Sequence, residues 1–151
     1  MGLRALDRAL GGLQGNSPQR HRDHRVSHDF TTTRRVIGLA IDVHRQLGPG
    51  LIESAYEACL AYELEHSGIA HKRQIALPLV YKTVRLDCGY RMDFVVEPDL
   101  VLEIKAVAKV LLLPVHKAQL LTYLRASGHP IGLLINFNSV VLKDGLYRMV
   151  L

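Results

Sequence analysis

The sequence is poor in cysteine and lacks tryptophan, and these shortages narrow the kinds of protein it can encode. Cys59 and Cys88 form no CxxC pair, so we expect neither a disulfide scaffold nor a zinc site. No apolar run reaches the roughly 18 residues that cross a bilayer. Arg and Asp side chains interrupt the first 15 residues, unlike the continuous apolar segment of a signal peptide. The sequence therefore predicts a cytoplasmic protein with free thiols and no membrane partner.

Outside the N-terminal segment the sequence has little excess of charge of either sign. The net charge of the 151 residues is +5. Residues 1–35 carry seven Arg and three Asp, whereas residues 36–151 carry twelve Lys or Arg and eleven Asp or Glu. The C-terminal part is therefore nearly neutral, and bulk charge by itself gives little support for a nucleic-acid-binding surface. Hydrophobic residues make up 48% and charged residues 22%, a balance typical of a globular domain.

The N-terminal segment differs from the rest in composition. Residues 1–29 are rich in Gly, Arg and His and show no sustained hydrophobic period, so we predict a mobile basic segment there. From Thr31 onward, apolar residues recur at helical spacing and predict a helix as far as Leu47. A second amphipathic stretch predicts a helix that ends at Gly68. Residues 30–151 are expected to form a single domain.

The helical period gives way to strands in the middle of the chain. Residues 72–107 predict several strands that are separated by turn-forming residues. A third helix is expected to begin near Pro114 and to end at Gly128, and residues 131–137 predict a buried strand. A closing hairpin is expected around Lys143-Asp144-Gly145. This order of elements predicts an α/β fold with a mixed sheet.

Strand alternation places charged side chains on one face of the predicted sheet. In the stretch "VLEIKAV", Glu103 and Lys105 point to the same side. Asp93 lies on the preceding predicted strand. A two-residue turn would leave Asp93 and Glu103 on opposite sides, whereas a three-residue turn at Glu97-Pro98-Asp99 pairs them directly. We predict the three-residue turn because its proline suits an early turn position, which would bring the two Cβ atoms to about 4.5–5.5 Å.

Such a pair of carboxylates predicts a cation site. Two carboxylates this close repel one another unless a cation lies between them. Oxygen ligands suit Mg²⁺ or Mn²⁺, and Mg²⁺ usually takes one or two protein carboxylates. Lys105 beside the cation could orient or help deprotonate an attacking water. The alternative is that Glu103 and Lys105 form a solvated ion pair on an exposed strand face.

Two of the predicted helices carry further candidate residues. Glu53 lies in the first turn of the second helix, where a carboxylate also stabilises the helix N-terminus without any site role. Gln119 and Tyr123 lie one turn apart on the third helix and either face the site or form an ordinary half-buried surface. His116, on the same face, is expected to be a capping or surface residue. Tyr56 is expected to pack its ring against the sheet with its hydroxyl hydrogen-bonded.

These motifs together resemble those of a known family. The segment "GLIESAY", residues 50–56, matches the motif that names the GxxExxY protein family. Asp93, Glu103-Ile104-Lys105 and the Gln119 to Tyr123 segment follow in an order similar to the PD-(D/E)xK nuclease-like superfamily, with the last segment like the QxxxY helix of its RecB-like branch. The resemblance covers residues 31–151. It implies a single domain with a restriction-endonuclease-like αβββαβ core, in which helices flank a central mixed sheet.

The spacing and the resemblance together give the candidate ligands their roles. Asp93 and Glu103 would bind Mg²⁺ or Mn²⁺ together with the backbone carbonyl of Ile104. Glu53 would contact water on that cation or a second cation. Lys105 would position the attacking water.

The expected activity is Mg²⁺-dependent hydrolysis of phosphodiester bonds in nucleic acid, with DNA favoured over RNA. Gln119 and Tyr123 would orient the site or touch the substrate. A homodimer stays open. Two alternatives also stay open: a nuclease-fold module that binds nucleic acid or a protein partner without catalysis, and an enzyme that acts on nucleotides rather than on polymers.

Overall fold

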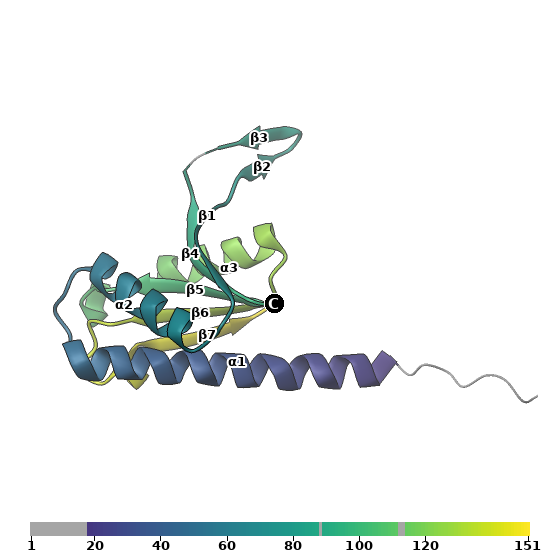
Figure 1. Ribbon diagram of the computed structural model, residues 1–151. Helices are drawn as coiled ribbons and strands as arrows, with labels where there is room; N and C mark the ends of the chain where they lie inside the picture. The colour runs from purple at the N-terminus through teal and green to yellow at the C-terminus, as the bar shows by residue number, and fades with distance from the viewer. Residues whose placement is uncertain (1–17, 88, 112–113) are drawn as a thin grey trace, which may run out of the picture.

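A five-stranded mixed sheet forms the centre of the protein (Figure 1). The computed structural model describes residues 18–87, 89–111 and 114–151. The strands lie in the order β1-β4-β5-β6-β7; β5 and β6 are parallel, and the other neighbouring pairs are antiparallel. Their bounds are β1 His71–Ala76, β4 Arg91–Val96, β5 Leu100–Lys105, β6 Ile131–Asn136 and β7 Leu146–Val150.

Helices cover both faces of this sheet. Helices α1 (Pro18–Leu47) and α2 (Glu53–His66) pack on one face, and α3 (Pro114–Ser127) packs on the other. The short 3-10 helix η1 (Lys109–Leu111) precedes α3, which makes the crossover between the parallel strands β5 and β6, and η2 (Leu142–Gly145) precedes β7. The core therefore follows the order αβββαβ, and the predicted restriction-endonuclease-like α/β fold is confirmed.

Strand alternation divides the apolar side chains between two clusters. The α1/α2 face holds the larger cluster, in which Phe94, Leu102 and Ile104 of the sheet pack against both helices. In its centre the Tyr56 and Phe137 rings stack with centroids 4.6 Å apart. The α3 face holds the smaller cluster, made of Leu77, Met92, Val95, Val101, Leu120, Tyr123, Leu124 and Leu134.

A hairpin interrupts the chain between β1 and β4. Strands β2 (Leu79–Tyr81) and β3 (Val84–Leu86) form a separate two-stranded sheet. The hairpin extends away from the central sheet, above the level of α3 (Figure 1). Lys82 at its turn adopts a left-handed backbone conformation with φ 55°. Because the hairpin is inserted into the β1–β4 pair, it leaves the core topology unchanged.

The predicted start of the first helix was wrong. Helix α1 begins at Pro18 rather than at Thr31, so it includes part of the segment expected to be mobile; residues 1–17 lie outside the described residues. Proline is favoured in the first helical turn, and a helix that extends beyond the sheet needs no apolar period to continue. Although α1 has 30 residues, no helix of the described ranges is long and apolar enough to cross a membrane.

The predicted hairpin at the C-terminus was also wrong. Residues 142–145 form the 3-10 helix η2, and the following strand β7 pairs with β6. Gly145 lies against the Asn136 carbonyl and the Ser139 side chain, where an added Cβ atom would overlap both. This stretch therefore packs against the end of β6 at a position that only glycine fits, and β7 pairs with β6 instead of with a preceding hairpin strand.

Candidate active site

The pairing of β4 with β5 confirms the predicted register. Phe94 pairs with Leu102, Val95 with Val101 and Val96 with Leu100 in antiparallel orientation. The connection is the three-residue loop 97–99, in which the Glu97–Pro98 peptide is cis. One step further along this register, Asp93 lies opposite Glu103. The odd-length turn therefore brings both carboxylates to the same end of the strand pair.

The regular pairing of β4 with β5 ends next to Asp93, and its pairing with β1 is interrupted there. Beyond the last β4–β5 pair, Asp93 Oδ2 accepts a hydrogen bond from the Ile104 backbone N–H at 2.7 Å. On the other side, Gln74 of β1 stands opposite Asp93 in the register and adopts a left-handed backbone with φ 50°. A left-handed backbone is unfavourable for a non-glycine residue, and such strained residues cluster at functional sites. The irregular backbone thus coincides with the candidate catalytic aspartate.

Glu103 and Lys105 form a buried ion pair rather than a solvated one. Lys105 Nζ donates a hydrogen bond to Glu103 Oε1 at 2.9 Å. The side chain of Glu103 is 4% exposed and that of Lys105 is 15% exposed. The second carboxylate oxygen, Glu103 Oε2, is buried and has no hydrogen-bond partner among the described residues. A buried oxygen without a partner is costly, so this arrangement indicates a site that is completed by something beyond the described side chains.

Burial and nearby negative charges raise the pKa of both carboxyl groups. Burial, reinforced by the negative charge of Asp93, raises the pKa of Glu103 to about 7, although Lys105 partly opposes the rise. The pKa of Asp93 is also raised, first by burial and then by the charges of Glu57 and Glu53, against the hydrogen bond from Ile104. Perturbed carboxyl groups in one place are typical of functional sites. A divalent cation between them would reverse these shifts.

Lys105 carries a positive charge in this environment. Burial alone would lower its pKa, but the charge of Glu103 and the hydrogen bond to it outweigh burial, and the net pKa is raised. Glu53 and Asp93 add to that rise. A lysine with a raised pKa stays protonated near neutral pH, so Lys105 is suited to orienting water or offsetting phosphate charge and is not suited to accepting a proton.

The family model for the PD-(D/E)XK nuclease superfamily matches residues 31–149. The chain belongs to the PD-(D/E)XK nuclease superfamily. Searches of curated proteins and of solved structures each gave no match. Asp93 and Glu103-Ile104-Lys105 have the residue types and order that the superfamily name describes. The narrower resemblance to GxxExxY proteins and to the RecB-like branch stays a prediction.

The segment "GLIESAY" positions Glu53 in this superfamily fold. Gly50 takes a left-handed φ of 102°, which lets the chain turn into α2. The Tyr56 hydroxyl donates to the Gly48 carbonyl at 2.6 Å and accepts from the Leu51 N–H at 3.1 Å. The buried ring of Tyr56 is stacked on the sheet side, as predicted. Tyr56 therefore fixes the loop from which Glu53, the first residue of α2, acts on the charges of β4 and β5.

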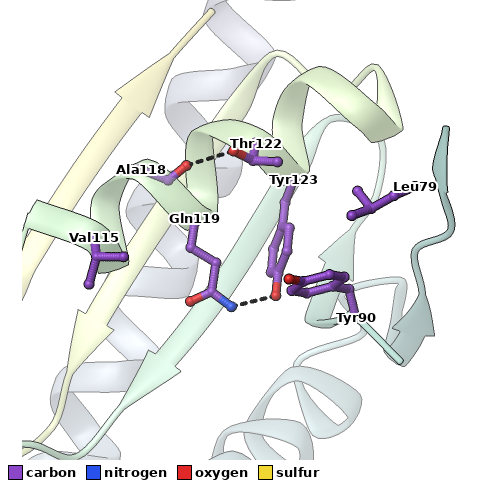
Figure 2. A pocket seen from close by; sticks show the side chains of 7 residues that line it. All are labelled: Leu79, Tyr90, Val115, Ala118, Gln119, Thr122 and Tyr123. Carbon is purple, nitrogen blue, oxygen red and sulfur yellow. Dashed lines mark hydrogen bonds between the residues drawn. The ribbon is translucent and has the colours of Figure 1, made fainter. Parts of the chain in front are cut away.

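Gln119 and Tyr123 of α3 meet each other on the same face as the carboxylates. Gln119 Nε2 donates to the Tyr123 hydroxyl at 2.5 Å. Tyr123 is 3% exposed, and its pKa is raised by burial and by the charge of Glu103, against the hydrogen bond from Gln119. Both residues line a groove of about 350 Å³ (Figure 2). His116, one turn earlier, does not line this groove.

The structure adds Glu57 to the residues around the site. Glu57 Oε1 accepts hydrogen bonds from Arg73 at 3.1 Å and from Gln74 Nε2 at 2.9 Å. Its charge raises the pKa of Asp93. The sequence places Glu57 one helical turn after Glu53, but its contacts with Arg73 and Gln74 of β1 depend on how α2 packs against that strand.

Asn136 is a second residue that the sequence did not single out. Its side chain is 1% exposed; Oδ1 accepts from the Val107 N–H at 3.1 Å, and Nδ2 donates to the Val107 carbonyl at 2.8 Å. The Phe137 N–H donates to the Lys105 carbonyl at 2.8 Å. These bonds hold the end of β5 beside β6. The signal in the sequence was a lone polar residue at the end of the apolar run "IGLLIN".

The donor set fits a divalent cation held by few protein ligands. Among the described residues, no group of three or more His, Cys, Asp or Glu side chains is placed to hold a metal ion. Two carboxylates with one unpartnered buried oxygen nevertheless suit Mg²⁺, which usually keeps several waters and takes one or two protein carboxylates. In this geometry Asp93 and Glu103 are better candidates for cation ligands than Glu53 or the Ile104 carbonyl. The ligand roles of Glu53 and of the Ile104 carbonyl stay predictions.

Proposed function

We propose that the protein hydrolyses phosphodiester bonds of nucleic acid with Mg²⁺ or Mn²⁺ as its cofactor. The observation that carries the proposal is the group of buried Glu103 and partly buried Asp93 and Lys105 at one end of the β4–β5 pair. Membership of the PD-(D/E)XK nuclease superfamily supports a nuclease-like activity. DNA is favoured over RNA as the substrate, and a cytoplasmic location is expected.

Asp93 and Glu103 would hold the cation. When bound, it would supply Lewis-acid polarisation of a phosphoryl oxygen and lower the pKa of a water molecule. The hydrogen bond from Ile104 fixes the orientation of the Asp93 carboxylate through its Oδ2 atom. Glu103 Oε1 is fixed in the same way by Lys105, which leaves Oε2 as the oxygen directed to a ligand. The protein thereby presents two oriented oxygens and needs little reorganisation on binding.

Lys105 would act on the substrate. An ammonium group has three N–H donors, of which Glu103 takes one. The others are available for a phosphoryl oxygen and for the attacking water. Because Lys105 keeps its proton near neutral pH, it would stabilise the negative charge that develops on phosphorus. Glu53 would contact water on the cation or a second cation, and Gln119 and Tyr123 would orient the site or touch the substrate.

A cleavage assay tests this proposal. End-labelled single-stranded DNA, duplex DNA and RNA are incubated with the protein in Mg²⁺ or Mn²⁺, beside the variants Asp93→Ala and Lys105→Ala. We expect both variants to lose at least about a hundredfold in rate, since removing one group that stabilises transition-state charge costs that much. Asp144→Ala and Lys143→Ala alter exposed residues of the same types in η2 and serve as matched controls.

The assay also separates the alternatives. Cleavage that survives in both Asp93→Ala and Lys105→Ala would contradict the assignment of the site. Binding of nucleic acid without cleavage of any substrate would favour a non-catalytic module. Hydrolysis of nucleotides but not of polymers would favour the nucleotide-processing alternative.

A further inference from the structure

We propose that the groove between α3 and Tyr90 receives one unstacked nucleobase of the substrate. The protein would then act on single strands or frayed ends in preference to continuous duplex. This inference rests on the proposed function and adds the form of the nucleic acid to it.

The groove has the volume and the lining of a site for one small ring. Its volume of about 350 Å³ lies at the low end of the roughly 300–1,000 Å³ of small-molecule sites. Leu79, Val115 and Ala118 provide apolar walls. Tyr90 lines the groove close to Tyr123 (Figure 2), and 41% of its surface is exposed. A base can stack on such an exposed aromatic ring whatever its identity.

Polar atoms lie at one edge of this groove. Gln119 donates through Nε2 to Tyr123, and within the described part of the chain no donor reaches Gln119 Oε1. The amide is held by that bond and presents its oxygen as an acceptor. The Thr122 hydroxyl donates to the Ala118 carbonyl and so remains able to accept. An exposed ring face beside fixed acceptors matches a heteroaromatic base, whose edges carry N–H donors.

Tyr123 connects the groove with the candidate site around Asp93 and Glu103. Tyr123 lies edge-on to Tyr90, with ring centroids 6.3 Å apart. The charges of Glu103, Lys105 and Asp93 all act on the Tyr123 hydroxyl. A nucleotide whose base enters the groove would therefore have its phosphate near the proposed cleavage site. Within a continuous duplex both faces of a base are covered by its neighbours, so a base must leave the stack to meet Tyr90.

The hairpin segment that contributes Leu79 and Tyr90 to the groove is basic, which favours a polyanion over an apolar peptide. The segment from Leu79 to Arg91 carries Lys82, Arg85 and Arg91 against one acid, Asp87. These basic residues are exposed on the hairpin and at the start of β4. Phosphates on either side of a bound base would meet this positive charge.

Binding measurements with Tyr90→Ala test the inference. The probes are a fluorescein-labelled single-stranded DNA of mixed sequence and its duplex, with Ca²⁺ in place of Mg²⁺ to slow hydrolysis. We expect Tyr90→Ala to raise the single-strand Kd about tenfold, as for the loss of one stacked base, and to change the duplex Kd less than twofold. Tyr90→Phe keeps the ring and should restore binding. Tyr62→Ala removes an exposed tyrosine that lines another surface and is the matched control.

Removal of the bases provides the second arm. Replacing every base of the single-stranded probe by an abasic site should weaken wild-type binding at least about tenfold, and the same replacement should cost Tyr90→Ala about tenfold less. Equal effects of Tyr90→Ala on both probes, or an equal cost of base removal in the wild type and in Tyr90→Ala, would overturn the groove inference alone. If the wild type neither binds nor cleaves any nucleic acid, the proposed function fails and the inference fails with it.

Discussion

The two faces of the central sheet differ in the side chains that the same strands bury on them. On the α1/α2 face, β5 presents Leu102 and Ile104, both fully buried among apolar neighbours. On the α3 face, the same strand presents Val101, then Glu103, then Lys105, so that an apolar position is followed by a buried ion pair. Burial on the α1/α2 face therefore stabilises the fold, whereas on the α3 face the desolvation of charged groups offsets part of that stabilisation.

Along β5, the residues that stabilise the fold and the residues of the candidate site therefore lie on opposite faces. A buried ion pair is seldom favourable compared with an apolar pair of the same size. Its presence on one face only, next to a second carboxyl group, Asp93, and an irregular backbone, indicates a functional cost rather than a structural need. Substitutions on the two faces should therefore change stability in opposite directions.

The largest effect is expected from Leu102→Ala on the α1/α2 face. Leu102 is completely buried in the large cluster, so the substitution should lower the free energy of unfolding by about 2–5 kcal/mol. Activity per folded molecule should stay unchanged at temperatures well below the unfolding midpoint. Urea unfolding measures the first effect, and Leu86→Ala on the exposed hairpin is the control. Loss of activity in the folded fraction of Leu102→Ala would contradict the claim that the α1/α2 face contributes to stability and not to activity.

Glu103→Gln on the α3 face should act in the opposite direction. The pKa of Glu103 is raised from its ordinary 4.5 to about 7 in the folded protein, so between these values the folded state binds the proton more tightly than the unfolded chain. The stability of the wild type therefore falls as the pH rises through this window, by on the order of 3 kcal/mol in total. The neutral glutamine avoids this loss and should make the protein more stable than the wild type above pH 7, with no activity.

Urea unfolding between pH 4.5 and 8 measures this slope. The exposed loop carboxylate in Glu97→Gln provides the control, and its slope should match that of the wild type. A wild-type stability that rises through the window would contradict the raised pKa of Glu103.

Tyr56→Phe probes the connection between the faces. The substitution keeps the ring stacked on Phe137 but removes the hydrogen bonds to Gly48 and Leu51. We expect a loss of about 1–2 kcal/mol in stability together with a fall in kcat, because the loop that places Glu53 loosens. Tyr62→Phe on the exposed surface of α2 should change neither quantity. An unchanged kcat would contradict a role of Glu53 in the site that depends on this loop.

The smallest effect is expected from Gln119→Ala. Loss of its bond to the Tyr123 hydroxyl should cost about 0.5–1.5 kcal/mol. That bond lowers the pKa of Tyr123, so the pKa should rise further in the variant. Ultraviolet titration of the tyrosines measures the rise, with Thr122→Ala as a neighbouring control. A tyrosine titration identical to that of the wild type would show that the two side chains do not interact in solution.

Local patterns were enough to predict the face and register of the site. Alternation along β5 and the odd length of the loop at Pro98 place Glu103, Lys105 and Asp93 together, and both depend only on neighbouring residues. The burial of Glu103 could not be predicted in the same way. It depends on β6 and on the packing of α3, which are distant in sequence.

The remaining features arise from long-range packing. The left-handed backbone at Gln74 and the contacts of Glu57 depend on how β1 meets α2. The groove forms because Leu79 and Tyr90 of the hairpin region meet α3. No periodicity in the sequence reports where an inserted hairpin folds, nor that α1 continues as far back as Pro18.

Thermal unfolding of the wild type and Glu103→Gln, with and without Mn²⁺ at pH 8, tests the central claim most directly. Without Mn²⁺, the variant should have the higher Tm. At about one hundred times its Kd, Mn²⁺ should stabilise the wild type by about 2.7 kcal/mol, which raises its Tm by several degrees, and should leave Glu103→Gln unchanged. Equal stabilisation of both proteins by Mn²⁺, or a Glu103→Gln variant that is less stable than the wild type, would contradict a buried carboxylate kept for a cation.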